Sequence, residues 1–145
     1  MLSTYVKPDH RKTWKAAEEV NHISPAMVKG APSLDDLREQ IEEIMGAAEV
    51  IVGYNAEFDL GFLKEGLGYE PRHDQIVFDV MAQFAPIYGQ WSDYHDDYKY
   101  QKLSRCAKHY GYKWEGEAHD ALADTKATLY CYKEMLKRDY NKISL

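Results

Sequence analysis

The chain has 145 residues, of which 45% are hydrophobic and 29% are charged, and this length and composition predict one globular domain over residues 1–145. Its 18 Lys and Arg residues against 24 Asp and Glu residues give a net charge of −6, which excludes a basic nucleic-acid coat and a polybasic membrane anchor. The two cysteines do not form a Cys-x-x-Cys pair, so we expect neither a disulfide framework nor a zinc knuckle. The sequence also lacks an apolar run typical of a signal peptide or a membrane span. We therefore expect a cytoplasmic protein without a membrane partner.

The first third of the chain predicts short elements and then one longer helix. Ser24-Pro25 is typical of an N-cap followed by proline at the first helical position. Ser33 and Asp36 resemble a capping box in which Asp replaces Glu. We therefore expect, in chain order, a short edge strand at residues 3–6 and helices at residues 13–22, 24–30 and 33–46.

The middle of the chain predicts a strand, a helix and a second strand. Residues 50–54 form a β-branched run without polar alternation, which is typical of a parallel strand covered on both faces. Residues 56–65 predict a helix that carries Phe58 and Phe62 and is stopped by two following glycines. Residues 75–79 predict the next strand.

The remainder of the chain predicts helices around one irregular segment. We expect a helix at residues 80–84 ended by Pro86, a tyrosine-rich loop at 88–100, a helix at 102–110 ended by Gly111, and a long helix at 118–140. The predicted class is therefore α/β with few strands.

The segment Asn55-Ala56-Glu57-Phe58-Asp59 directly follows the predicted buried strand. Open α/β sheets place ligand sites at the carboxyl ends of their strands, which makes Asp59 the first candidate for chemistry. If Asp59 lay on the inner face of its helix, it would need a metal or a hydrogen-bond donor as a partner. The alternative is an exposed acid in the first helical turn, which the helix dipole favours.

A second candidate pair opens the last predicted helix, in the segment His119-Asp120-Ala121-Leu122-Ala123-Asp124. Phosphodiester hydrolysis with two divalent ions needs carboxylates as hard oxygen ligands and a base with a pKa near neutrality. Asp124 and His119 suit these two tasks. Alternatively, His119 is a loop histidine and Asp124 a solvated helix acid.

Taken together, Asn-x-x-Phe-Asp after a β-branched strand and His-x-Ala-x-x-Asp at the start of the last helix form a specific combination. Over its whole length the chain resembles the histidine branch of the DEDD superfamily of 3′→5′ exonucleases, which includes ribonuclease T and the proofreading epsilon subunit of bacterial DNA polymerase III. Supporting matches are Tyr5-Val6-Lys7-Pro8, Asn21-His22-Ile23-Ser24, Ala31-Pro32-Ser33, Phe78-Asp79, Leu103 and Tyr110-Gly111.

This resemblance implies a ribonuclease H-like three-layer exonuclease fold and a single-stranded 3′ end of DNA or RNA as the substrate. It implies that Asp59 and Asp124 bind Mg²⁺ or Mn²⁺ and that His119 is the general base. Asn55 and Phe58 would position the scissile end and pack behind it.

The sequence departs from the family pattern at one motif, because it contains no Asp-x-Glu. In the family this motif lies on the first strand and supplies two of the four acids. We therefore expect an N-terminally truncated fold without the first two strands, an incomplete metal site, and weak or no activity of the chain alone. Direct rejoining of the remaining strands, a partner chain or domain-swapped homodimer, or an upstream segment would compensate for the missing strands.

Three further interpretations remain open on the sequence. A catalytically dead module could bind a nucleic-acid end or a protein partner. The dipeptides His73-Asp74, His95-Asp96 and His119-Asp120 are compatible with an HD-type phosphohydrolase, although such domains are all-helical. The aromatic residues of the 88–100 loop could stack on bases, cover a small core or form an oligomer contact.

Overall fold

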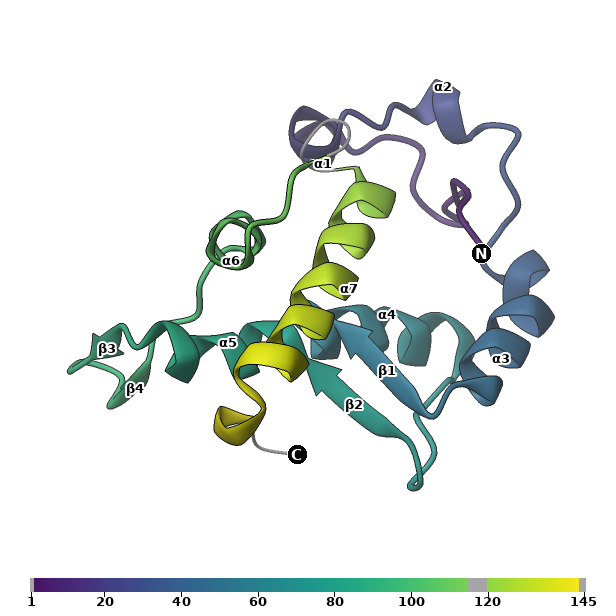
Figure 1. The fold of residues 1–145 in the computed structure, drawn as a ribbon. Helices are drawn as coiled ribbons and strands as arrows, with labels where there is room; N and C mark the ends of the chain where they lie inside the picture. Colours follow the sequence, from purple (N-terminus) through teal and green to yellow (C-terminus); the bar gives the residue numbers. More distant parts are fainter. Residues whose placement is uncertain (1, 115–119, 144–145) are drawn as a thin grey trace.

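A two-stranded parallel sheet lies at the centre of the structure, a computed structural model that describes residues 2–114 and 120–143 (Figure 1). Strand β1 (Val50–Gly53) pairs with β2 (Ile76–Asp79), with Val50 opposite Ile76 and Gly53 opposite Asp79. Helix α4 (Ala56–Leu67) connects the two strands and packs on one face of the sheet, while α7 (Ala121–Arg138) crosses the other face (Figure 1). The predicted strand, helix and strand are thus confirmed.

The main core lies between the sheet and three C-terminal helices. Besides α7, these are α5 (Val80–Tyr88) and α6 (Leu103–Tyr110), and α6 packs closely on α7. The fully buried members of this core are Phe78, Val80, Phe84, Cys106, Ala107, Tyr110, Cys131 and Met135. Both cysteines are free, in agreement with the expectation that the chain has no disulfide framework.

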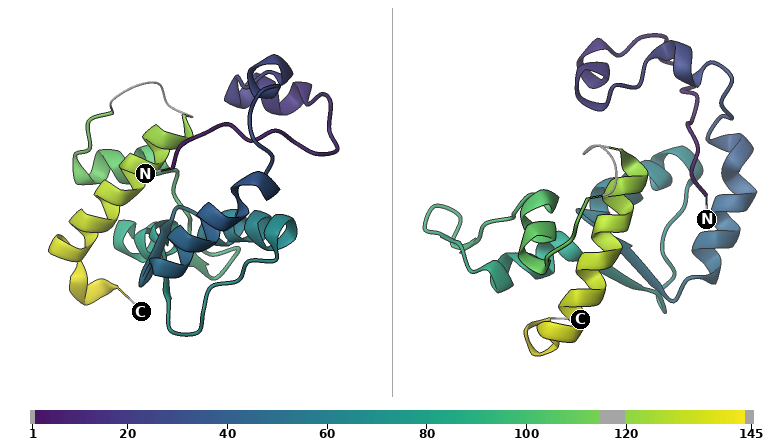
Figure 2. Two further views of the ribbon diagram at one scale, coloured as in Figure 1. Left: turned by 90° about the vertical axis from the view of Figure 1, so that its right-hand side faces the viewer. Right: turned by 45° about the horizontal axis from the view of Figure 1, so that its top comes forward.

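The N-terminal segment, residues 2–34, forms an arch beside this body rather than a layer on the sheet (Figures 1 and 2). It carries the short helices α1 (Lys15–Asn21) and α2 (Pro25–Val28), and α1 has no buried residue. The Trp14 indole N–H donates to the Ile23 carbonyl at 2.7 Å and holds the arch together. A 3₁₀ turn (Asp35–Leu37) then leads into α3 (Arg38–Ala47), and Ser33 and Asp36 make the reciprocal hydrogen bonds of the expected capping box.

The predicted edge strand at residues 3–6 is wrong. In this part of the chain the structure has one isolated parallel bridge, between Lys7 and Ser33, with the Lys7 N–H donating to the Pro32 carbonyl at 2.8 Å. A β-strand needs a neighbour to pair with its backbone groups, and no strand of the described residues lies beside residues 3–6.

Two further predictions are corrected in the segment after β2. Pro86 does not end α5, because the helix continues to Tyr88 and ends at Gly89, whose φ is 77° and whose N–H donates to the Ala85 carbonyl. The 88–100 loop contains a hairpin of two short strands, β3 (Trp91–Ser92) and β4 (Asp97–Tyr98). In the described chain, a last 3₁₀ turn (Tyr140–Lys142) follows α7.

One edge of the central sheet is open. The Ile76 N–H donates to the Glu49 carbonyl at 3.0 Å, and because backbone groups alternate in direction along a strand, Ile51 and Gly53 also face β2. The N–H and C=O groups of Val50 and Val52 therefore point to the opposite edge, where the described chain places no strand. Helices α4 and α7 contact β1 from the two faces of the sheet, in line with the expected strand covered on both faces, although all four residues of β1 are only half-buried.

Within residues 2–114 and 120–143, no helix combines the length and the apolar character that a membrane span requires.

Candidate active site

The turn between β1 and α4 brings the predicted residues Asn55, Phe58 and Asp59 to the carboxyl end of β1. Asn55 adopts a left-handed backbone conformation with φ of 67°, which Asn tolerates better than most residues. Gly53 is required just before it, because a Cβ atom at this position would lie 2.8 Å from the Ala56 Cβ. The end of β1 is further held by the Tyr54 hydroxyl, which donates to the Gln101 carbonyl at 2.7 Å.

Asp79, at the end of β2, holds the same turn from the neighbouring strand. Its carboxylate accepts hydrogen bonds from the backbone N–H groups of Asn55 (3.1 Å) and Ala56 (2.9 Å). It also caps α5 by accepting from the N–H groups of Met81 (2.9 Å) and Ala82 (3.3 Å). The sequence included Phe78-Asp79 only as a supporting match and did not reveal this contact, because the contact of Asp79 with Asn55 depends on the register of the two strands.

Asp59 lies in the first turn of α4 and is exposed, as in the alternative considered for it from the sequence. Partial desolvation of its carboxyl group, and then the negative charge of Asp79, raise the pKa of Asp59 above its ordinary value. No cation or hydrogen-bond donor among the described residues contacts this carboxylate, and its place in the first turn of α4 is what favours its ionised form.

Phe58 and Phe62 point to solvent from α4. Their side chains are 62% and 60% exposed, and their rings contact each other edge to face at 5.0 Å between centroids. The buried face of α4 is instead formed by Ala56, Leu67 and the half-buried leucines between them. Phe58 is therefore available for contact with another molecule, and it packs behind nothing in the described chain.

Asp124 lies in the first turn of α7, half-buried, on the other side of the sheet from α4 (Figure 1). The Asp120 side chain caps this helix by accepting from the Leu122 N–H at 3.2 Å. His119, the predicted general base, lies outside the residues that the structure describes.

The predicted metal ligands do not form a complete site in the described residues. No three His, Cys, Asp or Glu side chains among residues 2–114 and 120–143 are grouped closely enough to hold a metal ion. Mg²⁺ prefers near-octahedral oxygen coordination, and two separate carboxylates supply too few ligands for it. The residues described here therefore do not fit a two-ion centre by themselves.

A cavity of about 680 Å³ lies beside the first turn of α7. The start of α7 lines it with Asp120, Ala121 and Leu122, and the arch lines it with residues that include Tyr5 and His22. The sequence did not reveal this cavity, because it depends on where the arch lies relative to α7.

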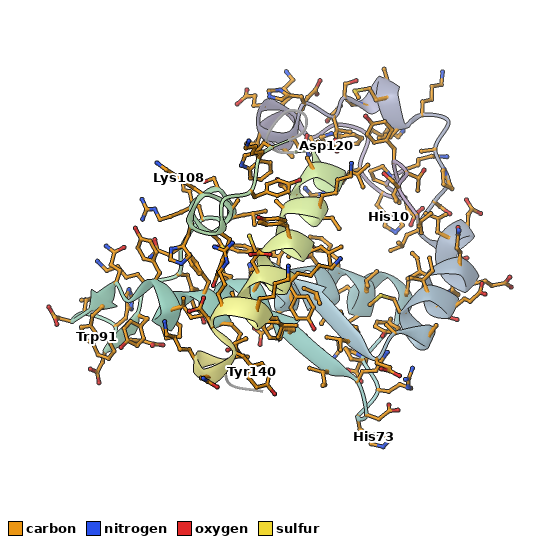
Figure 3. All side chains as sticks on the ribbon, viewed as in Figure 1. His10, His73, Trp91, Lys108, Asp120 and Tyr140 are labelled. Carbon is orange, nitrogen blue, oxygen red and sulfur yellow. The ribbon has the colours of Figure 1, made fainter. Side chains whose placement is uncertain are left out.

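The described parts of the three His-Asp dipeptides lie apart from one another. His73 lies at the far end of the sheet from Asp120, which begins α7, and the hairpin that carries Trp91 and His95 projects from a third place (Figure 3). A shared His-Asp metal site would require these pairs to lie together. This separation and the parallel sheet exclude the all-helical HD-type phosphohydrolase.

The aromatic residues of the hairpin also lie apart from the candidate site. Trp91 and Tyr98 contact each other across the two strands at 5.1 Å between centroids, and Tyr94 at the tip is 91% exposed. Figure 1 shows the hairpin projecting from the body beyond α5. These rings therefore cover no large part of the core.

Comparisons with known proteins give a consistent assignment. The RNase_T family model, described as an exonuclease, matches residues 1–132. A DNA polymerase III PolC-type from Clostridium perfringens is 33% identical over 143 residues, which cover 98% of this chain and 9% of that protein. The proteins of the same name from Staphylococcus haemolyticus and Staphylococcus epidermidis are 27% identical over 132 residues, or 89% of this chain and 8% of theirs. The chain thus spans less than a tenth of the length of these curated relatives.

Proposed function

The chain belongs to the RNase_T exonuclease family, and from this premise we propose that it supplies part of a 3′→5′ exonuclease site that removes nucleotides from a single-stranded 3′ end of DNA or RNA. The observation that carries the proposal is the β1–α4 turn. It gathers Asn55, Phe58 and Asp59 at the carboxyl end of a parallel strand, inside the segment that matches the family.

Each residue of this site has a proposed task. The Asn55 side chain orients the terminal nucleotide, and the exposed Phe58 ring stacks on its base, a contact that contributes about 1–3 kcal/mol in other single-strand binders. Asp59 and Asp124 supply two of the carboxylates for Mg²⁺ or Mn²⁺, which in this family support phosphodiester hydrolysis. His119 removes the proton from the attacking water.

We propose that the remaining carboxylates arrive with a strand that pairs with the open edge of β1. The unpaired backbone groups of Val50 and Val52 supply the hydrogen bonds for such a strand. In this arrangement β1 and β2 correspond to the last two strands of a ribonuclease H-like sheet of order 3-2-1-4-5. A second copy of the chain, a partner chain or another segment of a longer protein can provide the added strand.

A second candidate function is that of a catalytically inactive exonuclease-like module, which binds a nucleic-acid end or a protein partner. The observation in its favour is the lack of a three-ligand group among the described residues. The two functions differ in whether bonds are broken, so one assay separates them.

The assay uses single-stranded DNA and RNA oligonucleotides labelled at either end, incubated with the chain in Mg²⁺ or Mn²⁺. We expect weak or no shortening by the chain alone, and stepwise shortening from the 3′ end once a strand with the remaining carboxylates is supplied. This activity should be lost in Asp124→Ala and unchanged in Asp93→Ala, whose carboxylate is exposed on the hairpin. Shortening that persists in Asp124→Ala would indicate a contaminating nuclease. Binding of the oligonucleotide without shortening, once that strand is supplied, would favour the inactive module.

A further inference from the structure

The N-terminus of α4 is capped in an unusual way. A helix usually receives its first cap from the side chain of its own N-cap residue, and Asn is among the best residues for this task. Asn55 occupies the N-cap position of α4, yet its side chain makes no capping hydrogen bond. The Ala56 N–H is satisfied instead by Asp79, which belongs to the next strand along the chain, at 2.9 Å.

The contact with Asp79 also constrains the Asn55 backbone. The Asn55 N–H donates to the Asp79 carboxylate at 3.1 Å, and this helps to hold Asn55 in its left-handed conformation, which Asn adopts more readily than most residues other than glycine. The close approach of Gly53 to Ala56 leaves little room for the turn to relax. The Asn55 side-chain amide is therefore left pointing out of a rigid turn.

Asp79 is heavily engaged with the backbone. Its Oδ1 accepts from the N–H groups of Asn55, Met81 and Ala82, and its Oδ2 accepts from the Ala56 N–H. Displacement of this carboxylate would leave these donors without their partner. The carboxylate of Asp79 is thus committed to the backbone of two helix starts.

We propose that Asp79 is a positioning residue of the exonuclease site: it accepts from the first N–H group of α4, fixes the left-handed turn, and leaves the Asn55 amide free to bind the 3′-terminal nucleotide. This inference rests on the proposed function for the role of Asn55 in binding. The structural part, the capping of the first N–H group of α4 by Asp79, does not depend on nuclease activity.

The test compares amide hydrogen exchange by NMR in the wild type and in Asp79→Asn, in which an NH₂ group that cannot accept replaces Oδ2, the oxygen that accepts from the Ala56 N–H. We expect exchange at Ala56 to become about tenfold faster than at amides remote from the turn, as for the loss of a charge-assisted hydrogen bond, whereas Asn55 shares the retained Oδ1 with Met81 and Ala82 and should change less. Asp36→Asn is the matched control, because Asp36 accepts from Ser33 in the cap that precedes α3. It should leave exchange at Asn55 and Ala56 unchanged.

Exchange that accelerates only at Met81 and Ala82 would overturn the proposal, since Asp79 would then cap α5 alone. The wild type provides a second test that does not require the variant to fold. A through-hydrogen-bond coupling between the Ala56 amide nitrogen and the Asp79 carboxyl carbon is expected, and its absence would also overturn the proposal.

The functional part is read from binding of a single-stranded oligonucleotide with a free 3′-hydroxyl, measured by fluorescence anisotropy. We expect Asp79→Asn to weaken this binding about as much as Asn55→Ala does, whereas Asp36→Asn leaves it unchanged. If the exchange results are as expected but the wild type does not bind the oligonucleotide, the proposed function fails while the capping of α4 by Asp79 stands. If Asp79→Asn binds like the wild type, the positioning role is wrong.

Discussion

Gly53 is the residue at which the site tolerates least change. A Cβ atom at this position would lie 2.8 Å from the Ala56 Cβ and 2.9 Å from the Ala56 Cα, so Gly53→Ala must displace the start of α4. We expect a loss of about 1–3 kcal/mol in the free energy of unfolding, as for other overpacked positions. Urea denaturation followed by circular dichroism measures it.

Gly46 offers a matched control for this substitution. It lies near the end of α3, with no atom within 4 Å of the position that a Cβ would take. Gly46→Ala should therefore stabilise the chain by about 0.5–1 kcal/mol through helix propensity. Equal effects of the two substitutions would contradict the steric argument for Gly53.

At the residue scale, the sequence indicates which residues belong to the candidate site, but not how exposed their side chains are. Asn55, Phe58 and Asp59 were found from their position after a β-branched run, which is a local signal. Their exposure depends on which face of α4 meets the sheet. The second task of Asp79 depends on the pairing of Gly53 with Asp79. Neither fact can be obtained from neighbours in the sequence.

Among the elements, the contact between α6 and α7 provides a test that depends on pH. Partial burial acts to raise the pKa of Asp139, but hydrogen bonds from Lys142 and from the Tyr110 hydroxyl (2.9 Å) outweigh it, and the pKa is lowered. A carboxyl group whose pKa is lower in the folded state stabilises the fold above its unfolded pKa, about 3.9, and this stabilisation is lost as the pH falls through the folded pKa.

We therefore expect the wild type to lose stability as the pH decreases below about 4, and Asp139→Asn to lose less over the same range. Urea denaturation at pH values from 6 down to 2.5 measures both curves. Asp93→Asn, on the exposed hairpin, should follow the wild type. Parallel curves for Asp139→Asn and the wild type would show that Asp139 contributes nothing to the acid sensitivity.

The elements that could be predicted have local signals at their ends. The helix α6 ends at Gly111 and α4 at Gly68, both in the left-handed conformation, and β1 and β2 are rich in β-branched residues. The wrongly predicted helix end arose where the rest of the structure outweighed a local sequence signal. Pro86 was expected to end α5, but the helix continues for two more residues after losing one backbone hydrogen bond.

On the scale of the whole molecule, the open edge of β1 determines what the chain can assemble with. In a purified sample a second copy of the chain can offer the open edge of its own β1, so we expect dimers at high concentration. Val50→Pro should abolish them, because Val50 begins the strand and its N–H points away from β2. Light scattering after size-exclusion chromatography measures the native mass.

Ile51→Pro is the matched control, because the Ile51 N–H faces β2 and its loss should unfold the chain rather than merely dissociate it. A wild type that stays monomeric at all concentrations would exclude a second copy as the added strand. The wrong prediction of a strand at residues 3–6 and the open edge of β1 have the same cause, which is the lack of a neighbouring strand in the described chain. A strand forms only when it pairs with another, and the local sequence does not show whether a pairing partner is present.

The shared carboxylate of Asp79 has a consequence for how the molecule opens. Because one side chain accepts from the first turns of both α4 and α5, any motion that displaces Asp79 removes a partner from both helix starts at once. Openings that move Asp79 therefore expose the two helix starts together. Exchange at Ala56 and at Met81 should accordingly show the same dependence on denaturant, and the site should open and close as one unit.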